Sequence, residues 1–127
     1  MKTILVDAID GLILKDGTIF KAMHQLLETY PHRKIVLTGA NDEQFKQFNL
    51  HLCPYELFTL KHNPEKTDSQ YFKILLDTYN LKPEDTVFFE HNADAVESAQ
   101  SVGIPTMFYD AEKRDLGELK RFLDESL

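Results

Sequence analysis

The sequence predicts an α/β protein in which a parallel sheet is covered by helices on both faces. Short apolar segments rich in β-branched residues alternate with segments whose apolar residues recur at helical spacing. This alternation is typical of βαβ crossovers, which place successive strands in parallel. The 127 residues fall within the usual size of a single hydrophobic core, so we expect residues 1–127 to form one domain.

Five segments are predicted to be strands. The first is an unbroken Ile/Leu/Val-rich run closed by Asp7, as expected for a strand buried on both faces. The third, which follows Pro54, has the weakest pattern. In chain order the predicted strands cover residues 2–6, 35–37, 57–60, 87–89 and 105–109.

A β-hairpin flap is predicted directly after the first strand. Residues 12–14 and 18–20 are short apolar segments that flank Lys15-Asp16-Gly17. An Asp-Gly pair between two such segments favours a tight hairpin turn.

Five helices are predicted between and after the strands. Pro31 ends the first helix, Asn41 caps the second, and Thr67 or Asp68 caps the third, which closes before Pro83. Gly103 ends the fourth helix. The first, second, fourth and fifth helices are expected at residues 20–30, 41–48, 94–102 and 112–127.

Composition excludes several classes of function. A net charge of −7 and a pI near 5.1 argue against nucleic acid or an anionic membrane as the main partner. The single cysteine, Cys53, cannot form an intrachain disulfide. The N-terminus turns acidic too soon for a signal peptide, and no apolar run reaches the ~20 residues that a membrane span needs. We therefore expect a cytoplasmic protein.

Polar residues at the strand ends predict the site. Asp7, Thr38 and the triplet Glu90-His91-Asn92 follow three strands, and Lys66 precedes the third helix. In open α/β sheets, ligands bind at the carboxyl ends of the strands. An aspartate there can attack phosphorus, a threonine and a lysine can hold the phosphate oxygens, and a metal between carboxylates can offset charge. This combination indicates phosphoryl chemistry.

The order and spacing of these segments resemble the haloacid dehalogenase (HAD) superfamily, whose members are mostly phosphatases with an aspartyl nucleophile. The resemblance covers almost the whole chain. The segments that carry it are Ile4–Asp7 with Asp10-Gly11, Ile35–Gly39, Lys66–Phe72, Val87–Asn92 and Gly103–Thr106.

The resemblance implies a HAD-like Rossmannoid three-layer sandwich with strand order 3-2-1-4-5. Family members usually insert a cap domain after the flap or after the third strand, but neither gap here holds more than one helix and a connection, so we expect no cap domain. The resemblance makes Asp7 the nucleophile, places phosphate on Thr38, Gly39 and Lys66, and implies Mg²⁺ held by Asp7 and Glu90. The substrate would be a phosphorylated small molecule or a macromolecule. A capless site is open, so an oligomer could supply a lid.

Two positions depart from the family pattern. The family's phosphatases place a second Asp two residues after the nucleophile, where this chain has Ile9. Asp10 comes one residue later and would face the site only if the backbone bulges at residues 8–9. His91 stands where the principal metal-binding Asp is expected, and imidazole is a poor magnesium ligand. Asp10 or His91 would then serve as the acid/base.

These departures leave two functions open. One is a HAD-like hydrolase, most simply a phosphatase. The other is a HAD-shaped binding module that has lost turnover, because the phosphate-holding positions are kept while the acid and metal positions are changed.

Overall fold

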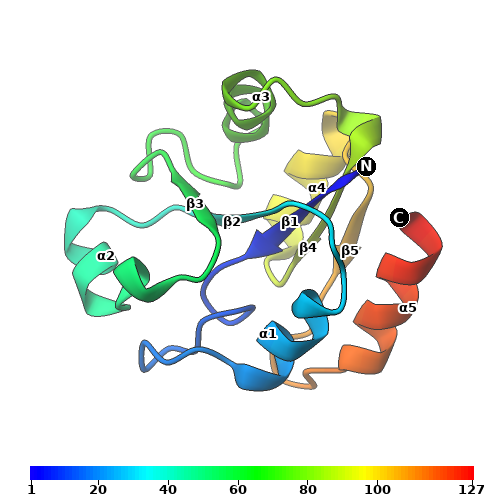
Figure 1. The fold of residues 1–127 in the computed structure, drawn as a ribbon. Helices are drawn as coiled ribbons and strands as arrows, with labels where there is room; N and C mark the ends of the chain where they lie inside the picture. The colour runs from blue at the N-terminus through cyan, green and yellow to red at the C-terminus, as the bar shows by residue number, and fades with distance from the viewer.

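The computed structural model describes all residues from 1 to 127 and contains one five-stranded parallel sheet (Figure 1). The strands lie in the order β3-β2-β1-β4-β5, which confirms the predicted topology. Their bounds are β1 (Thr3–Asp7), β2 (Lys34–Thr38), β3 (Glu56–Thr59), β4 (Thr86–Glu90) and β5 (Thr106–Phe108).

The central strand β1 is buried along its whole length, which explains its unbroken apolar sequence. Successive side chains of a strand point to opposite faces, so Ile4 and Val6 join one core while Leu5 joins the other. In the register with β2, Asp7 pairs with Leu37. Thr38, one residue further along β2, therefore ends beside Asp7 at the same edge of the sheet.

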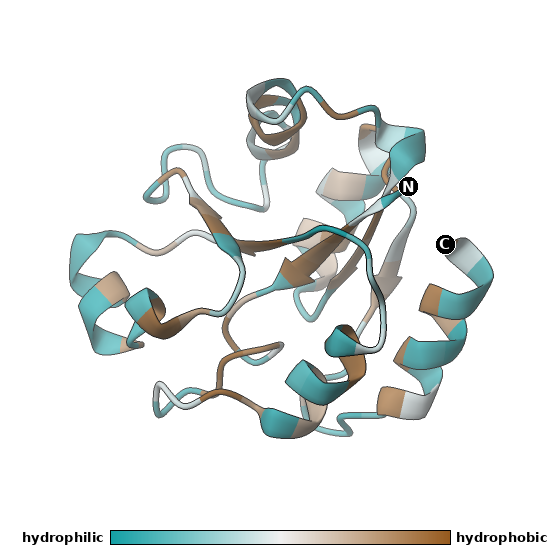
Figure 2. Cartoon of the chain, viewed as in Figure 1, coloured by the Kyte–Doolittle hydropathy of each residue, from teal (hydrophilic) through white to brown (hydrophobic).

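Helices cover both faces of the sheet. The helices α1 (Lys21–Glu28) and α5 (Leu116–Ser126) pack on the core that contains Ile4 and Val6 (Figure 1). The helices α3 (Ser69–Thr78) and α4 (Ala93–Ser101) pack on the core that contains Leu5. In the hydropathy view the strands are the most continuously apolar part of the chain (Figure 2). The predicted three-layer α/β/α sandwich is thus confirmed.

Short polar side chains cap the second and third helices, as predicted, whereas α1 follows Phe20 without a side-chain cap. Asn41 forms a capping box with Gln44 at the start of α2 (Asp42–Gln47). The third helix takes Asp68 as its cap rather than Thr67, with the Asp68 side chain accepting from the Gln70 N–H. Asn92 caps α4, so that this helix starts at Ala93, one residue earlier than predicted. Two 3₁₀ turns, η1 (Leu50–Leu52) and η2 (Pro83–Asp85), precede β3 and β4.

The last helix begins later than predicted, at Leu116 instead of residue 112. The Asp110 side chain accepts hydrogen bonds from the backbone of Glu112 and Lys113, and this satisfies the backbone in a turn. Arg114 then takes a left-handed φ of 50°, which breaks helical geometry, and Asp115 caps the helix.

The predicted flap forms only as a reduced hairpin. Ile13 makes isolated bridges with Ile9 and Ile19, without regular strands. The turn itself is as expected, with a 2.8 Å bond from the Leu14 N–H to the Thr18 carbonyl and Gly17 at a φ of +84°. The segments on either side are too short to continue a ladder.

No cap domain is inserted in the sheet connections. Residues 8–20 lead from β1 to α1 and residues 60–68 lead from β3 to α3. None of the helices has the combination of length and apolar character that a bilayer crossing requires.

Replacing Gly11 with alanine is expected to lower the free energy of unfolding by about 1–3 kcal/mol. Gly11 lies in the turn beneath the end of β1, and a Cβ atom there would come 2.2 Å from the Asp7 carbonyl oxygen and 3.1 Å from the Asp7 Cβ. The backbone of the strand end would have to shift to relieve this overlap. Urea unfolding monitored by circular dichroism measures the loss.

Gly117→Ala is the matched control for Gly11→Ala. Gly117 lies exposed in α5, and the nearest neighbour of a methyl group added there would be a surface carboxylate oxygen of Asp115 at 3.3 Å. Alanine favours helix over glycine by up to about 1 kcal/mol, so this variant should be as stable as the wild type or more so. Equal stability of the two variants would contradict the close packing beneath Asp7.

Candidate functional site

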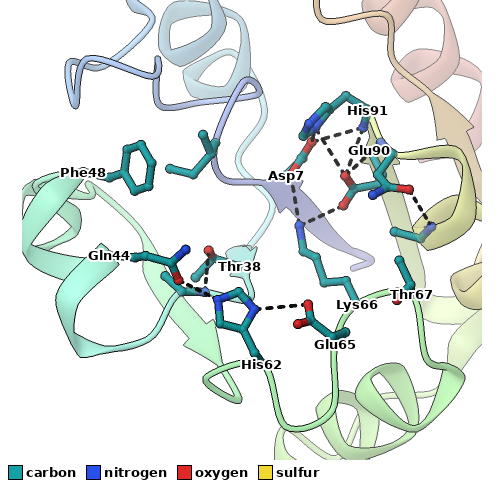
Figure 3. A pocket seen from close by; sticks show the side chains of 15 residues that line it. Asp7, Thr38, Gln44, Phe48, His62, Glu65, Lys66, Thr67, Glu90 and His91 are labelled. Carbon is teal, nitrogen blue, oxygen red and sulfur yellow. Dashed lines mark hydrogen bonds and ion pairs between the residues drawn. The ribbon is translucent and has the colours of Figure 1, made fainter.

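A pocket of about 300 Å³ opens at the carboxyl ends of β1, β2 and β4 (Figure 3). Asp7 closes β1, Thr38 closes β2 and Glu90 closes β4, and all three side chains line the pocket. Lys66 reaches the same pocket from the segment ahead of α3. The structure therefore brings together the carboxylates, the hydroxyl and the ammonium group that the sequence placed at the strand ends.

Lys66 bridges two buried carboxylates. Its Nζ lies 3.0 Å from Asp7 Oδ1 and 2.8 Å from Glu90 Oε1, and each carboxylate side chain is only 1% exposed. Burial opposes the charge of Lys66, but the two carboxylates outweigh burial and raise its pKa. Burial also opposes ionisation of Glu90, yet Lys66 and the hydrogen bonds hold its pKa at about 2. For Asp7 burial prevails and raises the pKa.

The segment that carries Lys66 is held in place by α4. The Ser98 hydroxyl donates a 2.6 Å hydrogen bond to the Thr67 carbonyl, next to Lys66. Because α4 packs on the sheet through Ala99, this bond ties the lysine to the same rigid core as the two carboxylates.

His91 makes the other contacts to the carboxylates. Its backbone N–H lies 3.1 Å from both Asp7 Oδ2 and Glu90 Oε2, and its ring Nδ1 contacts Asp7 Oδ2. The hydrogen bonds to Asp7 and then Glu90 raise the pKa of His91 to about 10, so the ring is an imidazolium at neutral pH. The carboxyl groups of Asp7 and Glu90 thus face the Lys66 ammonium group and the His91 imidazolium.

Asp10 does not line the pocket with Asp7. The chain leaves the extended conformation after β1, and Asp10 adopts a left-handed φ of 67° in the turn. Its carboxylate lies 3.9 Å from His91 Nε2 and 3.7 Å from Lys15 Nζ, on the outer side of the imidazole. Ile9 lines the pocket instead, so an apolar side chain occupies the place where the family's acid was expected.

Thr38 is oriented by its neighbours. Its Oγ1 accepts a 3.1 Å hydrogen bond from the Ala40 N–H, which leaves the hydroxyl proton available to a ligand. The buried Tyr71 hydroxyl lies 2.8 Å from the Thr38 carbonyl and 3.3 Å from the Phe58 carbonyl, and so joins the ends of β2 and β3 to α3. Gly39 follows and also lines the pocket.

Sequence reasoning missed the wall opposite Asp7. His62 Nε2 lies 2.5 Å from Gln44 Oε1, and its Nδ1 lies 3.1 Å from Glu65 Oε2 (Figure 3). Gln44 Oε1 also accepts from the Asn41 N–H, so the capping box of α2 orients the glutamine toward the histidine. Phe48 adds an apolar surface beside them. A glutamine in a short helix and one of five histidines carry no sequence signal for this contact.

The donor set suits magnesium poorly. Asp7, Glu90 and His91 offer ligand atoms within 4.8 Å of one another, close enough for one metal ion. Magnesium, however, takes oxygen ligands in a near-octahedral array, and one of these three donors is an imidazole nitrogen. Both oxygens of each carboxylate already accept hydrogen bonds from Lys66, His91 or Asn92. The residues present do not fit the family's ion.

Solved structures with the same fold include an enzyme of the HAD family. A HAD-family enzyme from Bacteroides thetaiotaomicron, solved with magnesium and inorganic phosphate, is 21% identical and matches 79% of this chain with a TM-score of 0.64. This chain spans 56% of that enzyme's length. The core domain of a candidate phosphoglycolate phosphatase from Streptococcus pneumoniae is 17% identical, with a TM-score of 0.63 over 97% of this chain and 95% of its own.

A third solved structure has nearly the same length as this chain. It is an uncharacterized protein from Corynebacterium glutamicum, 12% identical, with a TM-score of 0.66 over 98% of this chain and 96% of its own. No family model and no curated protein matches the sequence. The chain therefore has the HAD-like fold, as the order of its motifs predicted.

Stability is expected to fall as the pH rises from neutral toward 10. The unfolded chain releases the His91 proton near pH 6.5, whereas the folded chain keeps it to about pH 10. The stabilisation of the folded chain by protonated His91 is therefore fully present below pH 6.5, and it is lost as the pH rises through about 10. Its slope is at most about 1.4 kcal/mol per pH unit. Urea unfolding at pH 7, 8 and 9 measures it, and His91→Asn should show a flatter profile. Parallel profiles for the two proteins would contradict the proposed ion pair.

Proposed function

We propose that this protein is a HAD-like hydrolase that cleaves phosphate monoesters through a covalent intermediate on Asp7. The observation that carries the proposal is the position of the Asp7 carboxylate, at the base of the pocket, with Lys66 and His91 bonded to it and Thr38 also lining the pocket. The solved phosphate complex of the Bacteroides enzyme supports the same class of ligand for this fold.

The reaction would run in two displacements. A carboxylate oxygen of Asp7 attacks phosphorus, an acyl phosphate forms, and the ester oxygen leaves as an alcohol or phenol. Water then attacks the phosphorus, inorganic phosphate is released and the Asp7 carboxylate is restored. The Thr38 hydroxyl, the Gly39 backbone and the Lys66 ammonium would stabilise the phosphate oxygens in both steps.

Proton donation to the leaving oxygen should be weaker than in an enzyme that has a carboxylic acid beside the nucleophile. Ile9 lines the pocket at the place expected for that acid, and the cationic groups near Asp7 are His91 and Lys66. His91, with Asp10 on its outer side, is the proton donor we propose for the leaving oxygen. Because this donor is a weak acid, aryl phosphates, whose phenols leave readily, should be better substrates than alkyl phosphates.

The pocket volume favours a small substrate. About 300 Å³ is at the lower end of small-molecule sites and accommodates a phosphate with a compact organic group. Such a group would lie between the apolar surface of Ile9 and Phe48 and the polar wall of Gln44 and His62. We therefore propose a phosphorylated small molecule, or a phosphorylated end group of a larger one.

Phosphate release from a panel of aryl and alkyl phosphates tests the proposal. Borohydride added during turnover, followed by peptide mass spectrometry, should convert Asp7 to homoserine, because hydride reduces an acyl phosphate but not a free carboxylate. No release from any ester, together with thermal stabilisation by vanadate or tungstate, would instead identify the binding module without turnover.

A further inference from the structure

We propose that the His91 side chain takes the place of a divalent metal ion in this site, so that Asp7 and Glu90 are bridged by the His91 ring and the Lys66 ammonium group. The inference concerns charge and coordination, and it holds whether or not the protein hydrolyses phosphate esters. It is therefore tested by metal binding.

The imidazole contacts both carboxylates that an ion would have to share. Its Nδ1 contacts Asp7 Oδ2 and lies 3.3 Å from Glu90 Oε2. The three groups satisfy the distance condition for a common metal, with all ligand atoms within 4.8 Å of one another. The ring itself joins the two acids.

Every oxygen of the acid pair already has a donor. Lys66 donates to Asp7 Oδ1 at 3.0 Å and to Glu90 Oε1 at 2.8 Å. The remaining oxygens, Asp7 Oδ2 and Glu90 Oε2, accept from the His91 backbone, and Glu90 Oε2 also accepts from the Asn92 backbone at 3.1 Å. Asp7 Oδ2 and Glu90 Oε2 each accept two hydrogen bonds, so a metal ion bound by these two oxygens would have to displace donors that the fold already holds in position.

Lys66 already bridges the two carboxylates, with its Nζ 3.0 Å from Asp7 Oδ1 and 2.8 Å from Glu90 Oε1. A divalent cation in the same place would lie beside this buried ammonium group, which is costly in a buried site.

Asp10 acquires a role in this arrangement. Its carboxylate faces the outer ring nitrogen of His91 at 3.9 Å and is itself approached by Lys15 at 3.7 Å. The imidazole thus has an acid on each side, Asp7 on the inner nitrogen and Asp10 on the outer one. Asp10 is a positioning residue for the ring.

Isothermal titration calorimetry with Mg²⁺ and Mn²⁺ on EDTA-treated protein is the first measurement. The wild type should show no stoichiometric binding at millimolar metal. Substituting His91→Asp removes the cation and adds a third oxygen ligand between the carboxylates, so this variant should bind Mn²⁺ at least tenfold more tightly than the wild type. Its melting temperature should rise on adding Mn²⁺.

His62→Asp is the matched control, because it makes the same change on the other histidine of the pocket, away from the acid pair. It should bind metal no better than the wild type. Stoichiometric Mg²⁺ or Mn²⁺ binding by the wild type would overturn the proposal, as would Zn²⁺ binding that disappears in His91→Asn. A folded His91→Asp protein that binds no metal would also overturn it.

A measurement on the wild type alone covers the case in which His91→Asp does not fold. The imidazole ¹⁵N resonances of His91 should stay unchanged when a tenfold excess of Mg²⁺ or Zn²⁺ is added. A shift or broadening confined to His91 would show that an ion displaces or ligates the ring, and would contradict the proposal.

Discussion

Asp7→Asn is expected to lower phosphate-ester turnover by at least about 1,000-fold. The amide oxygen is a far weaker nucleophile than a carboxylate, and the covalent intermediate cannot form on it. Glu90, the neighbouring acid, stands on β4 and is held by Lys66 and by the backbone of the residues that follow it, so it does not take the place of Asp7. Steady-state release of phenol from an aryl phosphate measures the loss.

Asp110→Asn is the matched control for this result. Asp110 also follows a strand of the sheet, but it lies outside the pocket and its Oδ1 accepts backbone hydrogen bonds that an asparagine oxygen can also accept. Its turnover should equal that of the wild type. Circular dichroism and thermal melting show whether each variant is folded. A folded Asp7→Asn protein with full activity would rule out the aspartyl mechanism.

Lys66→Met is expected to lower the free energy of unfolding by about 3–5 kcal/mol. The methionine retains the volume of the side chain but leaves two buried carboxylates with only His91 as counter-charge. Removing one partner of a buried ion pair is strongly destabilising because the remaining charge stays desolvated. For a chain of 127 residues, the loss corresponds to a melting temperature roughly 10–20 °C lower.

A second substitution separates this effect from a general loss of packing. Lys66→Met combined with Glu90→Gln removes the charge of one of the two buried carboxylates and should recover part of the lost stability. Lys73→Met, at an exposed position of α3, should change stability by less than about 0.5 kcal/mol. An unchanged or lower stability in the double variant would contradict the electrostatic explanation.

The site residues at the strand ends could be predicted from the sequence because the carboxyl ends of parallel strands all lie at the same edge of the sheet. The apolar run that ends at Asp7 and the one that ends at Thr38 are neighbours in the sheet, and their register brings both side chains into the pocket. The place of Lys66 in the site could be predicted only from its position just ahead of the third helix. Neighbouring residues in the sequence do not determine where a lysine side chain points. The structure shows that the two carboxylates fix it.

Other features depend on contacts between distant segments and could not be predicted. The His62 wall requires the cap of α2 to meet a loop eighteen positions further along the chain. The direction of Asp10 follows from a left-handed turn at a residue that is not glycine, which sequence patterns do not signal. The delayed start of α5 depends on one side chain, Asp110, that competes with the helix for backbone donors.

The two walls of the pocket are built on different parts of the chain. Asp7, Glu90 and His91 stand at the ends of β1 and β4, whereas Gln44 and Phe48 stand on α2 and at its C-terminal end, and His62 shares the loop before α3 with Lys66. Gln44 and Phe48 are therefore structurally separate from the reactive floor, while His62 is coupled to it through the loop. Substitutions at Gln44 and Phe48 should change which molecule is accepted and leave the reactive floor intact.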